Sequence, residues 1–141
     1  MSHANVQFSV ASHVMAVLGT AEGHELRSAE LASSVNADPS FVRRVVSKLV
    51  KAGLVSTTRG KNGACALARP ASKITLLDIY QASQATASIA VHSYPVDKTC
   101  CVSRNIKDCM VDVLQQAQHG FEQSLAQQTL ADVVKSVRKD R

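Results

Sequence analysis

Aromatic residues are scarce in this chain, at 4% of its 141 residues, and tryptophan is absent. Because hydrophobic residues still make up 45%, the core must be built from Val, Leu, Ile and Ala, as in small helical proteins. No apolar run approaches the roughly 20 residues that a membrane-spanning helix needs, so no membrane partner is expected. The N-terminus lacks a charged segment followed by an apolar one, so we expect no secretory signal and a cytoplasmic protein.

The signatures of several enzyme classes are missing as well. The chain has no Cys-x-x-Cys pair, no glycine-rich phosphate loop and no His-Glu-x-x-His sequence. Its histidines are scattered, and none forms a nucleophile–base pair in sequence. A thiol-dependent enzyme is therefore disfavoured, and we expect that the chain is not an enzyme.

Positive charge is concentrated in the segment 38–61. Its basic residues outweigh the single acidic residue Asp38 by five charges, which equals the formal net charge of +5 for the whole chain. A localised basic face favours a polyanionic partner such as DNA, whose binding releases counterions. A charge that served only solubility would be spread over the chain.

The basic segment follows two predicted helices, 6–18 and 29–35, and begins with a third. Asp38-Pro39 supplies the N-cap and the first helical position of this third helix, 40–52, and Gly53 supplies the left-handed residue that ends it. Its apolar residues share one stripe, formed by Val42, Val45, Val46, Leu49 and Val50. The opposite face is polar and basic, and we predict that five of its side chains face the major groove: Ser40, Arg43, Arg44, Ser47 and Lys48.

Two β-prone runs, 54–58 and 64–68, are joined by a glycine-containing loop and predict a β-hairpin. At its tip, Arg59, Lys61 and Asn62 are expected to contact phosphates or to enter a minor groove. A basic helix followed directly by a basic hairpin is the layout of a winged helix-turn-helix. A winged helix that serves protein contact instead is disfavoured by the concentrated charge.

The C-terminal part of the chain predicts a dimer. After a stretch without periodicity, an apolar stripe runs for about five helical turns through Ile106, Met110, Val113, Leu114, Ala117, Phe121 and Leu125. This stripe is longer than a DNA-binding module needs, so it suits an interface with a second chain. Thr129 caps a last helix, and Thr75 caps an earlier helix that runs through Ser83.

We therefore expect a mainly α fold with a small β-hairpin, in which a winged helix-turn-helix is followed by a long C-terminal dimerisation helix. The predicted parts are a winged helix-turn-helix DNA-binding domain over 1–83, a loop with sensor cysteines over 84–103, and the dimerisation helix with the C-terminal helix over 104–141.

The cysteines fall into two groups. Cys65 lies in the second predicted strand, where a small buried apolar residue is the ordinary interpretation. Cys100, Cys101 and Cys109 lie close together where the loop meets the helix, which is more thiols than packing requires. A cytosolic protein keeps thiols reduced, so a disulfide framework is not expected.

Three interpretations of Cys100, Cys101 and Cys109 are open. In the first they form a redox-sensing switch without a cofactor, in which thiol oxidation or modification alters the dimer or tilts the DNA-reading helices. In the second they hold a metal or an iron–sulfur cluster, with His92 or a partner residue as the remaining ligand. In the third they are structural. If Cys101 and Cys109 share one helix, they lie about 12 Å apart, too far for a disulfide within one chain.

Several segments of the sequence resemble a known family. The residues that carry the likeness are 45–55 (VVSKLVKAGLV), 59–63 (RGKNG), 67–70 (LARP) and Ile74-Thr75. They resemble the bacterial winged-helix transcription regulators that include IscR, NsrR and CymR. The resemblance implies a homodimer held by its long C-terminal helix and bound to a near-palindromic operator in double-stranded DNA.

Two features depart from the usual pattern of that family. Gly63-Ala64-Cys65 stands where members typically carry Gly-Gly-Tyr. Cluster-binding members space three cysteines evenly, whereas here Cys100 and Cys101 are adjacent and Cys109 lies further on. The segments 101–106 (CVSRNI) and 129–132 (TLAD) resemble a branch of the family not known for clusters, which favours thiol chemistry. We predict a homodimeric transcription regulator, a repressor under thiol control, with half-sites about 34–36 Å apart.

Overall fold

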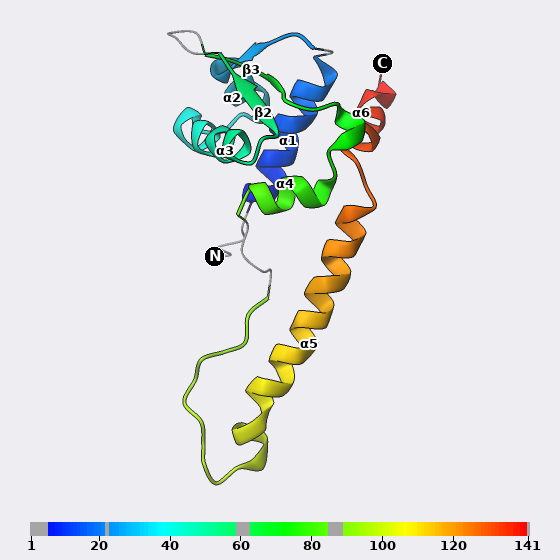
Figure 1. Ribbon diagram of the computed structural model, residues 1–141. Coiled ribbons are helices and arrows are strands. Elements are labelled where there is room, and N and C mark those ends of the chain that lie inside the picture. The colour runs from blue at the N-terminus through cyan, green and yellow to red at the C-terminus, as the bar shows by residue number, and fades with distance from the viewer. Residues whose placement is uncertain (1–5, 22, 59–62, 85–88, 141) are drawn as a thin grey trace.

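The computed structural model describes residues 6–21, 23–58, 63–84 and 89–140 of the chain. Helices and a small antiparallel sheet form the upper part in Figure 1, and one long helix extends away from it. The predicted mainly α fold is therefore confirmed. Along the chain the elements are α1 (Gln7–Thr20), β1 (Leu26–Arg27), α2 (Ser28–Val35), α3 (Pro39–Lys51), β2 (Val55–Thr57), β3 (Ala64–Leu67), η1 (Ala71–Lys73), α4 (Leu76–Ala82), α5 (Cys101–Ala126), α6 (Leu130–Val137) and η2 (Arg138–Asp140).

Local sequence signals fix the start and the end of α3. The carboxylate of Asp38 accepts a hydrogen bond from the amide of Phe41 at 3.3 Å, and Pro39 occupies the first helical position, where a missing N–H costs nothing. After the helix, Gly53 adopts a φ of +77°, which a residue with a Cβ rarely adopts. The predicted cap at Asp38 and the predicted stop at Gly53 are confirmed.

Reciprocal capping bonds begin α4 and α6. Thr75 and Asp78 exchange bonds of 2.9 and 3.0 Å, and Thr129 and Asp132 exchange bonds of 3.0 and 3.2 Å. The predicted caps at Thr75 and Thr129 are therefore confirmed. These two helix starts lie side by side, because Thr75 and Thr129 also form an isolated antiparallel bridge.

The wing has one strand more than predicted. The sheet order is β1-β3-β2, so the predicted hairpin of β2 and β3 is confirmed and β1 pairs with its outer edge. In this pairing Leu26 lies opposite Cys65, and Arg27 lies opposite Ala64. A strand of two residues has no periodicity of its own, and only its pairing with distant β3 makes it a strand.

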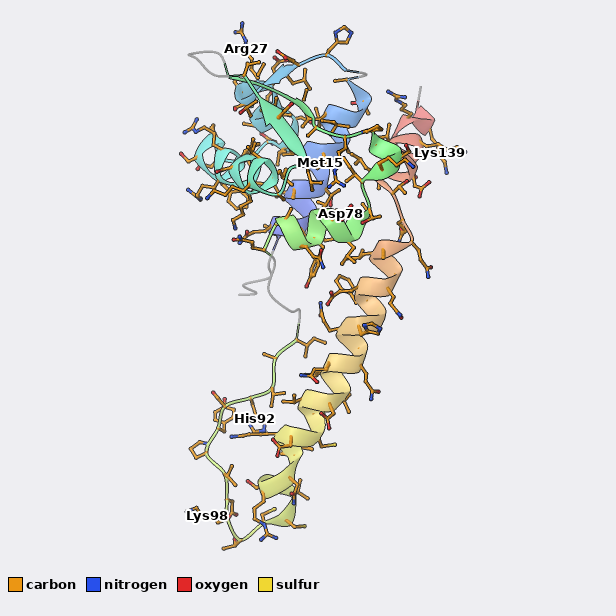
Figure 2. The ribbon with its side chains drawn as sticks, viewed as in Figure 1. Met15, Arg27, Asp78, His92, Lys98 and Lys139 are labelled. Atoms are coloured by element: carbon orange, nitrogen blue, oxygen red, sulfur yellow. The ribbon has the colours of Figure 1, made fainter. Side chains whose placement is uncertain are left out.

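The core gathers around α1, whose residue Met15 lies among the helices in Figure 2. The predicted apolar stripe of α3 is buried at Val42, Val45, Val46 and Leu49. Removing this apolar surface from water is the main force that holds α3 against the rest of the domain.

Helix α6 belongs to this core, although the predicted division of the chain grouped it with the long helix. Leu130 and Val134 are buried in the core, and α6 packs against α1. Gly19 permits the close approach, because a Cβ at this position would lie 2.6 Å from Cγ2 of Val134. The guanidinium of Arg138 also donates a hydrogen bond to the carbonyl of Thr20 at 3.2 Å.

Helix α5 leaves the domain and extends over 26 residues, about 39 Å at 1.5 Å per residue. Residues 89–100 carry no helix or strand and lead away from the domain alongside the N-terminal half of α5, which begins at the far end (Figure 1). The ammonium of Lys107 on α5 donates a hydrogen bond to the carbonyl of Tyr94 and holds this segment. Cys101 already begins the helix, so the predicted loop over 84–103 ends earlier than expected. Among the described residues, no helix is both long and apolar enough to cross a membrane.

Candidate nucleic-acid interface

The turn between α2 and α3 presents one face of α3 to the surface. Asn36 ends α2 in the left-handed conformation, with a φ of 60°, and its amide donates a hydrogen bond to the carbonyl of Ala32 at 2.8 Å. Two residues later Asp38 begins α3. The chain therefore reverses within a short turn, and α3 lies with its apolar stripe inward and its polar face outward.

Four of the five predicted groove residues share this outward face. Ser40, Arg43, Arg44 and Ser47 are all exposed. The guanidinium of Arg43 donates a hydrogen bond to the hydroxyl of Ser40 at 3.3 Å. The guanidinium carbon of Arg44 lies 5.8 Å from the centre of the Phe41 ring, a cation–π distance. Both arginines are thus oriented by a residue one turn earlier while their charges stay at the surface.

Lys48, the fifth predicted residue, lies at the border of this face. At 100° per residue it is about 80° from Ser40 around the helix, and its side chain is half-buried. Its ammonium donates hydrogen bonds to the side-chain oxygen of Gln7 on α1 and, at 3.5 Å, to the carbonyl of Ser83 after α4. Lys48 therefore ties α3 to two other helices.

Lys51 and Arg27 add positive charge that the predicted set did not include. Lys51 lies about 20° from Ser40 by the same helical spacing, on the exposed face. Arg27 is exposed in β1, next to the base of the wing (Figure 2). The helical period of α3 was sufficient to find Lys51, whereas no local signal marks β1. A shallow cleft between α2 and α3, lined in part by Ser33 and Arg43, adjoins the same surface.

The tip of the predicted wing, with Arg59, Lys61 and Asn62, lies outside the described residues. The base of the wing is closed by Thr58 and Ala64. The amide of Thr58 donates to the carbonyl of Ala64 at 3.0 Å, and the amide of Ala64 donates to the hydroxyl of Thr58 at 3.0 Å.

Cys65 is a packing residue, as predicted. Its side chain is 1% exposed in β3. Burial raises the pKa of the Cys65 thiol, and a hydrogen bond with the Ser28 side chain opposes this rise only in part. A buried thiol that stays protonated is a poor nucleophile.

The structure does not bring Cys109 close to the adjacent pair Cys100 and Cys101. Cys100 is half-buried at the N-cap of α5, whereas Cys101 and Cys109 are exposed on the helix. Cys109 lies about 12 Å along the axis from Cys101 and about 13 Å from Cys100. Disulfide bonds of Cys109 to Cys101 or to Cys100 within one chain are excluded, because a disulfide requires Cα atoms less than 7 Å apart.

The separation of Cys109 from Cys100 and Cys101 also disfavours a metal site formed by these three cysteines. Among the described residues, no three His, Cys, Asp or Glu side chains are close enough to hold a metal ion. His92, the predicted further ligand, packs its ring against Tyr94 at 5.5 Å in the segment that runs alongside α5 (Figure 2).

Part of the apolar stripe of α5 is open to solvent. Val113 is 49% exposed and Phe121 is 39% exposed, whereas Leu125 at the domain end is buried. An apolar groove runs between the helix and the segment after residue 88, and is lined in part by Ile89 and Leu114. Apolar surface of this kind is characteristic of an interface.

Comparisons with known proteins agree with this geometry. The family model Rrf2, described as "Iron-dependent Transcriptional regulator", matches residues 4–136. YwnA of Bacillus subtilis, named as an HTH-type transcriptional regulator, is 34% identical over 131 residues, which cover 92% of this chain and 96% of YwnA.

Solved structures share the fold. A crystal structure described as a transcriptional regulator from Lactobacillus plantarum has a TM-score of 0.80 and 27% identity, and the match covers 95% of this chain and 91% of that one. IscR of T. potens has a TM-score of 0.70 at 20% identity, over 99% and 91% of the two chains. CymR, the global cysteine regulator of B. subtilis, has a TM-score of 0.63 at 20% identity, over 96% and 98%.

Proposed function

The chain belongs to the Rrf2 family of DNA-binding transcription regulators, which are not enzymes, and from this premise we propose that it is a homodimeric repressor under thiol control. In this proposal the dimer binds a near-palindromic operator in the bacterial cytoplasm. Oxidation or modification of cysteine thiols then changes its affinity for DNA.

The polar face of α3 is the observation that carries the DNA-binding surface. Ser40, Arg43, Arg44 and Ser47 are exposed together, opposite a buried apolar stripe. In our proposal these side chains enter the major groove, where an arginine can bind guanine through two hydrogen bonds. Lys48 acts at the edge of this surface and keeps α3 in place. We also propose that Arg59, Lys61 and Asn62 contact phosphates or enter a minor groove.

A titration of labelled duplex DNA tests this surface. Arg44→Ala should weaken binding by about 1 kcal/mol or more, roughly fivefold, and lower the salt dependence by about one counterion. Arg104→Ala is the matched control, because it removes the same charge from an exposed position on α5. Equal affinities of the two variants at fixed salt would refute the assignment of α3.

The proposed dimer forms through α5. Its exposed apolar residues, Val113 and Phe121 among them, continue over a helix that extends beyond its own domain. Two such helices would cover each other's apolar stripes and hold two copies of α3 in a fixed relation. Sedimentation equilibrium of the full chain measures this association directly.

The proposed thiol control uses Cys100, Cys101 and Cys109. Cys101 and Cys109 are exposed, in contrast to buried Cys65, so they are the thiols that an oxidant can reach. Bonds from Cys109 to the other two are excluded within one chain, and a bond between adjacent Cys100 and Cys101 would strain the peptide between them. The expected product is therefore a modified single thiol or a bond between chains. DNA titrations before and after mild oxidation, with each cysteine changed to serine in turn, test this control.

The iron in the description of the family model does not fit this chain. A cluster needs thiolates that converge on one point, whereas Cys109 lies more than 10 Å along α5 from Cys100 and Cys101. We therefore assign no cluster to the cysteines of one chain. Iron and acid-labile sulfide in anaerobically purified protein, in stoichiometric amounts, would overturn this assignment and revive Cys100, Cys101 and Cys109 as ligands.

A further inference from the structure

Helix α5 packs against the rest of the domain chiefly through α4, close to the C-terminal end of α5 (Figure 1). The N-terminal half of α5 lies far from the domain. The direction in which α5 leaves the domain therefore depends on the side chains between α4 and α5.

Tyr80 of α4 is the central side chain of this contact, and only 8% of it is exposed. Its ring meets two others edge to face. The centroid distances are 5.4 Å to Phe8 on α1 and 5.3 Å to Phe121 on α5, with interplanar angles of 85° and 78°. Edge-to-face pairs are favoured over other ring arrangements, so they resist rotation of one helix against another.

A hydrogen bond adds direction to this contact. The side-chain amide of Gln118 on α5 donates to the phenol oxygen of Tyr80 at 3.0 Å. The same nitrogen also donates to the carboxylate of Glu122 at 3.1 Å, which holds the amide in this orientation. The phenol group thus fixes α5 at a second point, beyond the ring of Phe121.

The C-terminal end of α4 is connected to α3. The buried hydroxyl of Ser83 donates to the carbonyl of Tyr80 at 2.7 Å, and the carbonyl of Ser83 accepts from the ammonium of Lys48 on α3 at 3.5 Å. Tyr80 therefore lies between the helix that faces DNA and the helix proposed to form the dimer.

We propose that Tyr80 is a positioning residue for DNA recognition, and that it sets the spacing between half-sites that the dimer accepts. Through Phe121 and Gln118 it fixes the angle between α5 and the domain, and hence the distance and rotation between the two α3 helices. The inference rests on the proposed dimer. One added base pair moves a half-site by about 3.4 Å and turns it by about 35°, so a fixed angle accepts one spacing and rejects its neighbours.

Two variants remove the same hydrogen bond from opposite sides. Tyr80→Phe keeps the ring but loses the phenol oxygen, and Gln118→Met keeps the volume but loses the amide. Tyr94→Phe is the matched control, because this second tyrosine is 73% exposed and its ring lies against His92 rather than α5. The probes are a duplex selected by the wild-type protein from a random pool, and the same duplex with one base pair added or removed between the half-sites.

The wild-type protein and the control should discriminate strongly between these spacings. Loss of one hydrogen bond of ordinary strength should reduce the discrimination about fivefold in Tyr80→Phe and in Gln118→Met. The double variant should show no further reduction beyond Gln118→Met, because both changes remove the hydrogen bond between Gln118 and Tyr80, and the bond that Gln118→Met also loses, to Glu122, lies within α5. A role in stability alone would lower the melting temperature and leave the ratio of affinities between spacings unchanged.

Sedimentation of each protein tests the proposed dimer separately from the role of Tyr80. A dimer whose discrimination is unchanged in both variants, or a wild-type dimer that binds all spacings equally, would overturn the role of Tyr80 alone. A monomeric wild-type protein would overturn the proposed dimer and this inference together.

Discussion

Replacing Gly19 by alanine should destabilise the protein, although alanine is the better helix former. A Cβ at position 19 would lie 2.6 Å from Cγ2 of Val134, far inside van der Waals contact. Val134 is buried on α6, and a β-branched side chain in a helix has one strongly preferred rotamer, so turning its methyl group away costs free energy. The two helices must therefore separate, or Val134 must leave its rotamer.

The net effect follows from two opposed terms. Overpacking a core contact costs about 1–3 kcal/mol, while exchanging glycine for alanine in a helix gains at most about 1 kcal/mol. With the middle of the first range and the full helix-forming gain, we expect a net loss of about 1 kcal/mol, or roughly 3–4 °C in melting temperature for a chain of this size. Thermal and urea unfolding followed by circular dichroism measure this difference.

Gly120→Ala provides the matched control. A Cβ at position 120 on α5 meets no other atom within 4 Å, so only the helix-forming gain remains, and the melting temperature should rise by about 2–4 °C. Adding Val134→Ala to Gly19→Ala removes the clashing methyl group. The double variant should then be more stable than the sum of the single effects by at least about 0.5 kcal/mol. If Gly19→Ala were as stable as Gly120→Ala, the packing of α6 on α1 described above would be refuted.

Three further predictions concern the interface, pH and the thiols. Val113→Asp should weaken dimerisation at least about tenfold in sedimentation experiments, because it places a charge in the proposed apolar interface; an unchanged association constant would contradict that interface. Hydrogen bonds from the Thr129 amide and hydroxyl lower the pKa of Asp132 below its ordinary value of 3.8. The Asp132 carboxylate therefore stabilises the fold above pH 3.8 and loses this effect as the pH falls through its lowered pKa. Asp132→Asn should flatten the acid side of a plot of unfolding free energy against pH, and an unaltered plot would count against the cap. In native protein, iodoacetamide should alkylate Cys101 but leave Cys65 unmodified until unfolding, as mass spectrometry of peptides would show, and equal rates would refute the burial of Cys65.

The parts of the fold that depend on neighbouring residues could be predicted from the sequence. The apolar stripe of α3 and the caps at Asp38, Thr75 and Thr129 involve residues within a few positions of one another, so spacing alone reveals them. The hairpin followed from two β-prone runs around a glycine loop.

Contacts between distant residues could not be predicted in this way. The strand β1 exists because two residues pair with β3, almost 40 positions later. Lys48 was assigned to the exposed face by its charge, but its ammonium is bonded to Gln7, 41 positions earlier. Likewise, α6 packs closely on α1 because Gly19 has no side chain. The sequence does not show that Val134 is the residue opposite Gly19.

The candidate cysteine site was also only partly predictable from the sequence. Spacing along one helix was enough to separate Cys101 from Cys109 by about 12 Å once both were placed on a helix. The position of Cys100 at the N-cap was not visible in a segment without periodicity.

Footprinting of the wild-type protein on a duplex that it selects from a random pool tests the central proposal most directly. We expect two symmetric protected regions in the major groove, separated by one helical turn of about 34–36 Å or a multiple of it, and protection by Arg44→Ala should require at least about fivefold more protein. A single protected region, or a pool from which no sequence is enriched, would contradict a dimeric regulator that reads DNA with α3.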